Sequence, residues 1–389
     1  MNLSQQSHIK LYPLTIRKDK RHYIVEDSLS GDYFEMPKIC IEAINLMNKG
    51  ESLEEIEKKL VATFPEEEVD MVDFTSQLIE LGLVKEIDGE IVQITKENQS
   101  PASFIGISPR VGKFFFNKVT IILFIAIFFM NIFLFAMDPV LLPYYQDLFL
   151  FDTMMFNMLT FMAITLFLIF MHEFGHVLAM RSYNLPAKLS IGHRLFFVVF
   201  ETDLTPAWRL EPKQRNNLYL AGMCFDQIML FIALCIKLAF PEDNTLLTGI
   251  AGIVILDIFI KFIYQCSFYM KTDMYYLFEN ITGCYNVMEN GKQFLSKGLP
   301  FLKTDKTTEM FDGERNIVRL YSLFYIFGIL FTITLFIFYF LPQGVFALSQ
   351  TLPNLLRPVG SIAFWDAVVF VGQFVLLICF LCYSWMKNR

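Results

Sequence analysis

Residues 164–180 of the chain read ITLFLIFMHEFGHVLAM, an apolar stretch that holds three ionisable side chains within five positions. On insertion scales, an ionisable residue at membrane depth costs at least ~2.5 kcal/mol unless it is paired or binds something. His172, Glu173 and His176 therefore need a compensating partner. A bound divalent cation supplies one, and a hydrogen-bonded polar cluster between helices is the alternative.

The three residues fit the pattern His-Glu-x-x-His, which is typical of zinc sites on helices. Residues four apart lie on one face of a helix, so both imidazoles can bind the same ion. Glu173 projects beside that ion, where it can take a proton from a zinc-bound water. The chain has only five histidines, so a chance match to the pattern is rare.

The apolar residues gather in blocks of roughly 20 residues, the length that crosses a bilayer. Overall the chain is 54% apolar and 18% charged, whereas an ordinary soluble domain is about a quarter charged. The sequence therefore predicts a mainly α, polytopic membrane protein with about six transmembrane helices and a small N-terminal domain. The predicted spans are residues 119–137, 154–180, 218–240, 247–270, 317–341 and 362–385.

Lysine and arginine support this layout because they alternate between the loops, as the positive-inside rule requires. The loops after the second and fourth spans are rich in both residues, whereas the loops after the first and third spans have none. The N-terminus is polar and lacks a cleavable signal peptide. We therefore expect an integral, multi-pass protein of a bacterial cell membrane, with both termini in the cytosol.

The N-terminal part of the chain carries charges, alternation and ordinary turn signals. Short β-rich runs predict a hairpin, and three amphipathic helices follow, the second with a capping box of Ser52 and Glu55. The tail VKEIDGEIVQI holds an Asp-Gly turn and predicts a small wing. The predicted parts are an α+β, winged-helix-like domain at 1–96, a Ser/Pro/Gly-rich linker at 97–114 and a membrane domain at 115–389.

A catalytic zinc usually takes three protein ligands and keeps its fourth position for water. The candidates for the third ligand are Asp273, Asp257, Asp226, His193 and Asp203. The paired histidines lie near the cytosolic end of the second span, and Asp273 follows the cytosolic end of the fourth. Asp257 lies about 24 Å of helix deeper, so only one of the two aspartates can reach the histidines. We favour Asp273 and expect Asp257 to pair with Lys261, one turn further along.

The stretches FMHEFGHVLAMRSYNL, FETDLTPAWRL, LYLAGMCFD and KTDMYYLFENI, in this order, resemble the site-2 protease family of intramembrane zinc metallopeptidases. The resemblance covers roughly residues 115–340 and is greatest to the peptide zinc metalloprotease branch. It implies that His172, His176 and Asp273 bind Zn2+ and that Glu173 is the catalytic base. Met274 departs from the family, which usually has glycine after the aspartate. The PDZ-like domain of the stress-signalling members is not found in the sequence.

The N-terminal segment resembles the PqqD-like domains of systems that modify ribosomally made peptides. The resemblance rests on element order and on the stretches GDYFEMP, INLMNKGESLEEI and LIELGLV. Such domains bind a leader peptide by adding it as a strand to the edge of the hairpin. A generic winged-helix module with a structural or regulatory role is the alternative.

Together these features predict a metallopeptidase that cleaves a ribosomally made or membrane-associated peptide, for its maturation or export. Two alternatives stay open: site-2-type proteolysis of a signalling protein, and a non-catalytic peptide-binding or export subunit. The expected partners are the substrate, the lipid bilayer, and a peptide-modifying enzyme or transporter. The formal net charge of -7, without a dense Lys/Arg cluster, argues against nucleic-acid binding.

Three smaller features complete the expectations. Gly175 leaves room for close helix packing or substrate approach, and Ala221 and Gly222 can serve the same purpose. The segment ETDLTPAWRLEPKQR is either an interfacial strand that pairs with an extended substrate or a solvated loop. The seven cysteines lie mostly in apolar blocks, so we expect small buried side chains and neither disulfides nor metal ligands.

Overall fold

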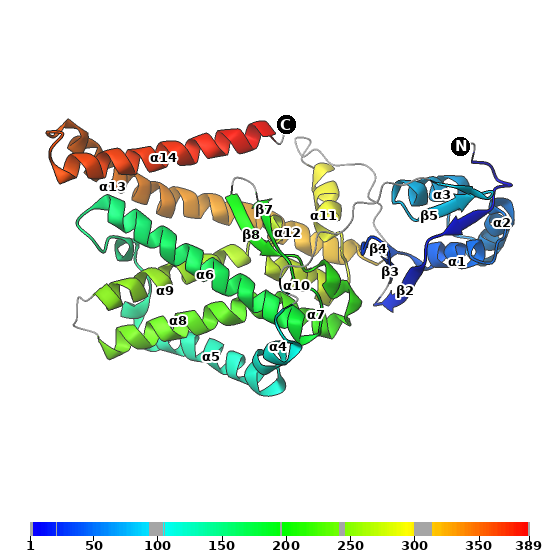
Figure 1. Ribbon diagram of the computed structural model, residues 1–389, viewed down its shortest axis with the longest axis horizontal. Helices are drawn as coiled ribbons and strands as arrows, with labels where there is room; N and C mark the ends of the chain where they lie inside the picture. The colour runs from blue at the N-terminus through cyan, green and yellow to red at the C-terminus, as the bar shows by residue number, and fades with distance from the viewer. Residues whose placement is uncertain are drawn as a thin grey trace. The chain divides into compact units, whose positions relative to one another are not determined.

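The computed structural model describes residues 3–20, 22–92, 104, 106–194, 197–240, 246–298 and 313–387. The chain forms two compact units, and its elements are labelled in Figure 1. The first unit holds Met1–Ala102 together with Thr205–Pro212, and the second holds Ser103–Leu204 and Lys213–Arg389. Helices dominate the described chain, and the N-terminal unit adds a small sheet region.

The N-terminal unit follows the predicted order of strands, three helices and a second hairpin. Strands β2 (Leu14–Asp19), β3 (His22–Asp27) and β4 (Tyr33–Met36) form an antiparallel sheet, and β5 (Val84–Ile87) pairs with both β1 (Ile9–Leu11) and β6 (Glu90–Ile91). The helices between them are α1 (Lys38–Met47), α2 (Leu53–Thr63) and α3 (Met71–Glu80). One core joins strands and helices through buried side chains that include Val25, Ile44, Leu53, Leu78 and Val84.

Two local sequence signals of this unit are confirmed. The hydroxyl of Ser52 accepts a hydrogen bond from the Glu55 amide at 3.4 Å, and the Glu55 carboxylate accepts one from the Ser52 amide at 3.2 Å. This capping box provides partners for amides that the start of α2 would otherwise leave without them. The β5–β6 turn holds Asp88 and Gly89 at φ values of 51° and 87°, in the left-handed region that both residue types tolerate.

The second unit is built around α6 (Met154–Ser182), the helix that carries the His-Glu-x-x-His pattern. Its other helices are α4 (Pro109–Phe115), α5 (Lys118–Met137), α7 (Pro212–Tyr219), α8 (Ala221–Ala239), α9 (Leu246–Gln265), α10 (Asp273–Thr282), α11 (Val287–Ser296), α12 (Arg315–Leu335), α13 (Leu341–Thr351) and α14 (Ile362–Lys387). The antiparallel hairpin of β7 (Leu189–Arg194) and β8 (Phe197–Thr202) follows α6. Helix α6 packs against α4, α8, α9 and α14, and also against β8.

Five helical segments of the described chain are long and apolar enough to cross a membrane: Lys118–Met137, Met154–Ser182, Pro212–Ala239, Leu246–Gln265 and Arg315–Leu356. They correspond to the first five predicted spans, with three differences: the third begins at Pro212 instead of residue 218, because α7 precedes α8 without a break in the apolar segment, and the fourth and fifth end elsewhere. The fourth ends at Gln265 instead of residue 270, because a 3-10 turn and Lys271 at a φ of 51° redirect the chain. The fifth continues past residue 341, because a π-helical turn (Phe336–Phe340) leads directly into α13. The sixth predicted span lies on α14, whose described apolar stretch is Ile362–Leu376.

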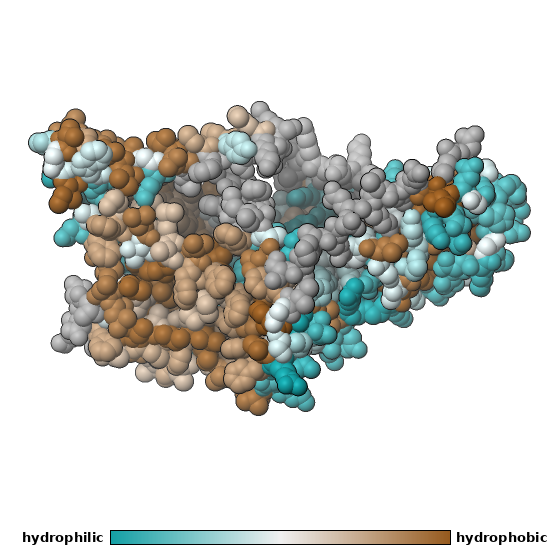
Figure 2. Space-filling model, in the orientation of Figure 1, coloured by the Kyte–Doolittle hydropathy of each residue, from teal (hydrophilic) through white to brown (hydrophobic). Residues whose placement is uncertain are grey.

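The surface of the helical unit is apolar over wide areas, which Figure 2 shows as brown across α5 and its neighbours. Val119, Ile122 and Phe129 on α5 expose 75%, 66% and 62% of their area. A soluble protein rarely leaves so much contiguous apolar surface in water. The long apolar helices and this surface together suggest a protein embedded in a membrane.

The expectation of buried cysteines is wrong for most of them. The cysteines are free, as predicted, but only Cys284 is buried, whereas Cys235, Cys266, Cys379 and Cys382 are exposed. A small thiol is compatible with the outer, apolar face of a helix as well as with a core, so the apolar surroundings in the sequence do not indicate burial.

Part of the predicted linker is helical. Residues 93–103 and 105 lie outside the described residues, but Pro109–Phe115 forms α4, which packs against the end of α6. A Cβ atom at Gly112 would lie 2.4 Å from the Ser182 amide nitrogen, so only glycine permits this approach of the two backbones. The chain therefore enters the second unit already in contact with the helix that carries residues 172–176.

The start of α6 is capped by a side chain that is distant in sequence, on the last helix of the unit. Asp366 on α14 accepts hydrogen bonds from the Met154 and Met155 amides at 2.9 and 2.6 Å, and it is 8% exposed. The local N-cap residue, Thr153, makes no capping bond itself. A carboxylate at a helix N-terminus satisfies unpaired amides and complements the helix dipole.

Replacement of Asp366 with alanine should lower the free energy of unfolding by about 1–2 kcal/mol, because two amides at the start of α6 lose their acceptor. Urea or thermal unfolding of the purified protein in detergent measures the change. Asp152 is an exposed carboxylate close to the same helix start, so Asp152→Ala is the control and should leave stability unchanged. Equal stability of the two variants would contradict the capping role.

Candidate metal centre

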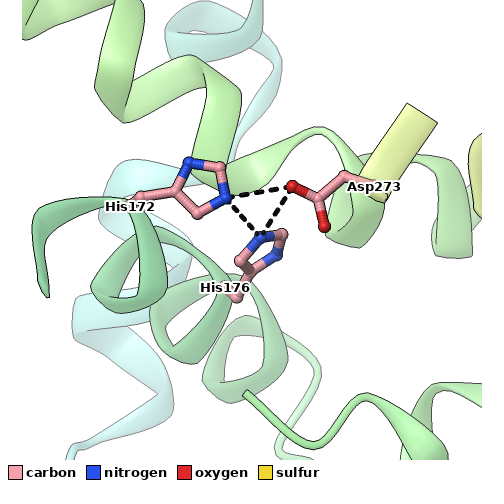
Figure 3. Close-up of side chains that lie close together, drawn as sticks. All are labelled: His172, His176 and Asp273. Carbon is pink, nitrogen blue, oxygen red and sulfur yellow. Dashed lines mark hydrogen bonds and ion pairs between the residues drawn. The ribbon is translucent and has the colours of Figure 1, made fainter. Parts of the chain in front are cut away.

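Three side chains from two helices converge on one point in the second unit (Figure 3). His172 and His176 lie one turn apart on α6, and Asp273 is the first residue of α10. Nε2 of His172 lies 3.0 Å from Asp273 Oδ2 and 3.3 Å from Nε2 of His176. Nε2 of His176 lies 3.5 Å from the same carboxylate oxygen. Each residue thus turns one metal-ligating atom toward the other two.

The spacing of these atoms suits a zinc ion. Ligands about 2.0–2.1 Å from zinc at the corners of a tetrahedron lie about 3.3 Å from one another. The three distances of 3.0, 3.3 and 3.5 Å bracket that separation. With three corners occupied by protein atoms, the fourth is left for water or a substrate oxygen, as in catalytic zinc sites.

Both imidazoles are oriented by a partner on the far side of the ring. Nδ1 of His172 lies 2.7 Å from Asp226 Oδ2, and Nδ1 of His176 lies 2.8 Å from the Leu218 carbonyl oxygen. A carboxylate and a carbonyl can only accept, so each Nδ1 carries the proton and donates it. The lone pair of each neutral ring is then on Nε2, facing the candidate site. Such partners fix the tautomer and orientation of metal-binding histidines.

Asp273 is held in place by the end of α9. The Gln265 side-chain amide donates to Asp273 Oδ2 at 2.9 Å, and Gln265 Oε1 accepts a hydrogen bond from the Asp273 backbone amide at 3.1 Å. Gln265 therefore fixes both the side chain and the backbone of Asp273 beside the two imidazoles.

Glu173 is anchored by the last residue of β8. Its Oε2 accepts hydrogen bonds from the Thr202 amide at 2.7 Å and from the Thr202 hydroxyl at 2.9 Å. The residue is 8% exposed, and its Oε1 makes no hydrogen bond to the residues that the structure describes. One carboxylate oxygen is thus fixed, and the other is left to accept a proton.

Two of the other candidate ligands, Asp257 and Asp226, make their contacts elsewhere. Asp257 pairs with Lys261 at 3.0 Å, as expected, and Asp226 lies behind His172 instead of facing the convergence point. The Asp203 amide donates a backbone hydrogen bond to the Lys188 carbonyl at 2.8 Å. The side chain of His193 lies outside the described residues.

Two glycines set how closely the helices approach the site. A Cβ atom at Gly175 would lie 2.7 Å from the Ala221 carbonyl oxygen, so α6 and α8 meet there in backbone contact. A Cβ atom at Gly222 would lie 2.4 Å from Nε2 of His172. The expected packing role of these small residues is confirmed, and Gly222 additionally leaves the space that the His172 ring occupies.

Sequence reasoning missed three partners of the site: Thr202, Gln265 and the Leu218 carbonyl. Thr202 lies in the segment that was considered as an interfacial strand, but nothing in its sequence marks it as a partner of Glu173. Gln265 could have been suspected as a polar residue at the end of an apolar span. A backbone carbonyl leaves no sequence signal.

No family model matches the chain, and no curated protein or solved structure matches it.

Gly222→Ala should weaken zinc binding by about tenfold or more, because the new methyl group displaces the His172 ring and ligand geometry is lost. Elemental analysis of the purified protein under buffered zinc measures the occupancy. At Gly344 on α13 a Cβ atom would meet nothing within 4 Å, so Gly344→Ala is the control. Full zinc occupancy in Gly222→Ala would show that the ring does not need this space.

Asp226→Asn should lower zinc affinity by about 10- to 100-fold without abolishing binding, because the carboxylate that orients His172 is lost while all three ligands remain. Competition with a chromophoric chelator gives the dissociation constant. Cys224→Ala, two residues earlier on α8, is the control. An unchanged constant in Asp226→Asn would mean that the contact at 2.7 Å does not support the metal site.

Proposed function

We propose that this chain is a membrane-embedded zinc metallopeptidase. The observation that carries the proposal is the convergence of three ligand atoms at zinc spacing beside an anchored glutamate. A structural polar cluster needs the histidines and the aspartate, but it does not need Glu173. Peptide hydrolysis does need a general base at that position. The family resemblance of the sequence points to the same chemistry.

The membrane setting is part of the proposal. In the proposed orientation the basic loops face the cytosol, as the distribution of lysine and arginine favours. His172 and His176 lie in the C-terminal half of α6, and Asp273 follows the end of α9. The candidate site is then close to the inner leaflet, where a peptide can approach from the cytosol or from the bilayer.

In the proposed hydrolysis, zinc activates the water and the carbonyl group, and the protein moves the proton and orients the ligands. When bound, zinc lowers the pKa of water and polarises a carbonyl group. Glu173 accepts a proton from the attacking water through Oε1 and returns it to the leaving amine. Thr202 keeps the Glu173 carboxylate in position through Oε2. Asp226, Leu218 and Gln265 hold the three ligands in the orientation that the ion needs.

We propose as substrate a ribosomally made or membrane-associated peptide in an extended conformation. A carbonyl group inside a helix is already hydrogen-bonded and shielded, so a helical substrate must unwind before cleavage. The N-terminal unit supports a delivery role, because its β2–β3–β4 sheet has edge strands to which a peptide can add. A peptide-modifying enzyme or a transporter is the matching partner.

Glu173→Gln should lower peptide cleavage by about 100-fold or more while leaving zinc content unchanged, because only the proton acceptor is lost. Mass spectrometry of unstructured peptides incubated with the protein in liposomes follows cleavage. The control is Glu66→Gln, an exposed glutamate of the N-terminal unit. Cleavage that survives in Glu173→Gln, or no cleavage by the unaltered protein, would contradict the proposal.

The ligand assignment has its own test. Asp273→Ala should lose zinc, because one of three ligands is gone, whereas Asp257→Ala should retain it because Asp257 pairs with Lys261. Elemental analysis of both purified variants distinguishes the two aspartates. Normal zinc in Asp273→Ala together with loss of zinc in Asp257→Ala would reverse the assignment.

A further inference from the structure

A second polar cluster lies on the same two helices as the metal centre, away from its ligands. The Thr165 hydroxyl on α6 donates to Asp257 Oδ1 on α9 at 2.6 Å. Nζ of Lys261, one turn further along α9, lies 3.0 Å from Asp257 Oδ2. The side chains of Asp257 and Lys261 are 6% and 22% exposed. The cluster therefore joins α6 to α9 inside the helical unit.

The cluster lies where a bilayer tolerates charge least. Asp257 is near the midpoint of α9 (Leu246–Gln265), so in the proposed orientation it is close to the centre of the membrane. A single charged residue there costs about 2.5–3.5 kcal/mol on insertion scales. Ionisable residues at such depth face the bundle interior or a water-filled cavity, and they commonly mark a pathway.

Two buried atoms of the cluster have hydrogen-bonding capacity that no protein group uses. Asp257 Oδ2 and Lys261 Nζ contact each other as an ion pair at 3.0 Å, and no other polar atom in the described part of the chain bonds to either. An ammonium group has three donors, and each carboxylate oxygen accepts up to two hydrogen bonds. Buried polar atoms of this kind are normally satisfied by protein or by ordered water. Water is the ligand that fits both a free donor and a free acceptor.

The cluster is connected to the metal centre along both helices. Asp257, Lys261 and Gln265 follow one another at four-residue intervals, so they lie on one face of α9. Gln265 holds Asp273. Thr165 and His172 are seven residues apart on α6, which again puts them on one face about 10 Å apart. On α9 polar side chains thus run from the cluster to Gln265, the partner of Asp273, whereas on α6 the buried Leu168 lies between Thr165 and His172.

We propose that Thr165, Asp257 and Lys261 form a water-holding site in the middle of the membrane, and that water passes from it to the metal centre along the polar face of α9 formed by Asp257, Lys261 and Gln265. A substrate that fills the cytosolic approach displaces water there, and this site supplies the water that hydrolysis consumes. The supply role rests on the proposed function. The presence of water at the cluster does not.

The competing explanation is a dry ion pair that only clamps α6 to α9. A dry pair can be exchanged for apolar residues of similar size with little loss, and often with a gain in stability. A hydrated site behaves differently, because its polar atoms retain water that apolar side chains cannot bind. The two explanations therefore differ in hydration, which can be measured without any peptidase assay.

Radiolytic footprinting tests the hydration. A short X-ray pulse splits water where it is bound, and the hydroxyl radical oxidises a neighbouring cysteine. The probe is Thr165→Cys. The control is Phe167→Cys, two residues further along α6, because Phe167 is 53% exposed on the side that faces the proposed lipid. In lipid nanodiscs the cysteine at 165 should be oxidised at least about tenfold faster than that at 167, since oxidation follows access to the oxidant. Equal rates would overturn the proposal.

A double replacement tests which residues hold the water. In the Thr165→Cys background, Asp257→Leu combined with Lys261→Leu should reduce oxidation to the rate of the Phe167→Cys control, while the unfolding midpoint stays the same or rises. Oxidation that persists in this variant would show that the ion pair does not hold the water.

The supply role has a separate readout. The double leucine variant should retain zinc and the KM of the unaltered protein. Its kcat should fall at least about fivefold, because leucine side chains cannot hold the water that the site is proposed to supply for hydrolysis. Unchanged kcat would overturn the supply role alone. If the unaltered protein cleaves no peptide, the proposed function fails, whereas the footprinting result still decides whether the cluster holds water.

Discussion

In the second unit, two imidazoles and a carboxylate lie close together in apolar surroundings, and the packing of the neighbouring helices makes this possible. Their ligating atoms lie 3.0 to 3.5 Å apart, a distance at which lone pairs repel unless a proton or a cation lies between them. The neighbouring helices conform to this requirement. Gly222 leaves space for the His172 ring, and Gly175 lets α6 meet the backbone of α8. Close helix packing and the candidate ligand set are thus parts of one arrangement.

Local structural features could be predicted from the sequence. The capping box at Ser52 and the Asp-Gly turn at residue 88 follow from a few neighbouring residues, and both are present. The helical positions of His172 and His176 follow from a spacing of four. The approach of Asp273 to the histidines could be anticipated because charge alternation between loops predicts a direction for every span. The boundaries of the spans were less predictable, since hydropathy does not detect the turn after Gln265 or the continuation of α12 into α13.

The partners that orient the site could not be anticipated in the same way. Thr202 reaches Glu173 from a hairpin, Gln265 reaches Asp273 from the preceding helix, and the Leu218 carbonyl belongs to the backbone. Each contact depends on how elements distant in the sequence pack, and no pattern within one element encodes that. The unused hydrogen-bonding capacity of Asp257 and Lys261 is equally undetectable in the sequence, which shows only an i,i+4 ion pair.

Asp366 has a consequence for how the protein is made. The carboxylate that completes the first turn of α6 is 212 positions downstream of Met154, on α14. While the ribosome is still synthesising the intervening residues, the amides at the beginning of α6 have no such acceptor, and the helix end can fray. The first turn of α6 is therefore completed only after α14 has been synthesised and has packed against it.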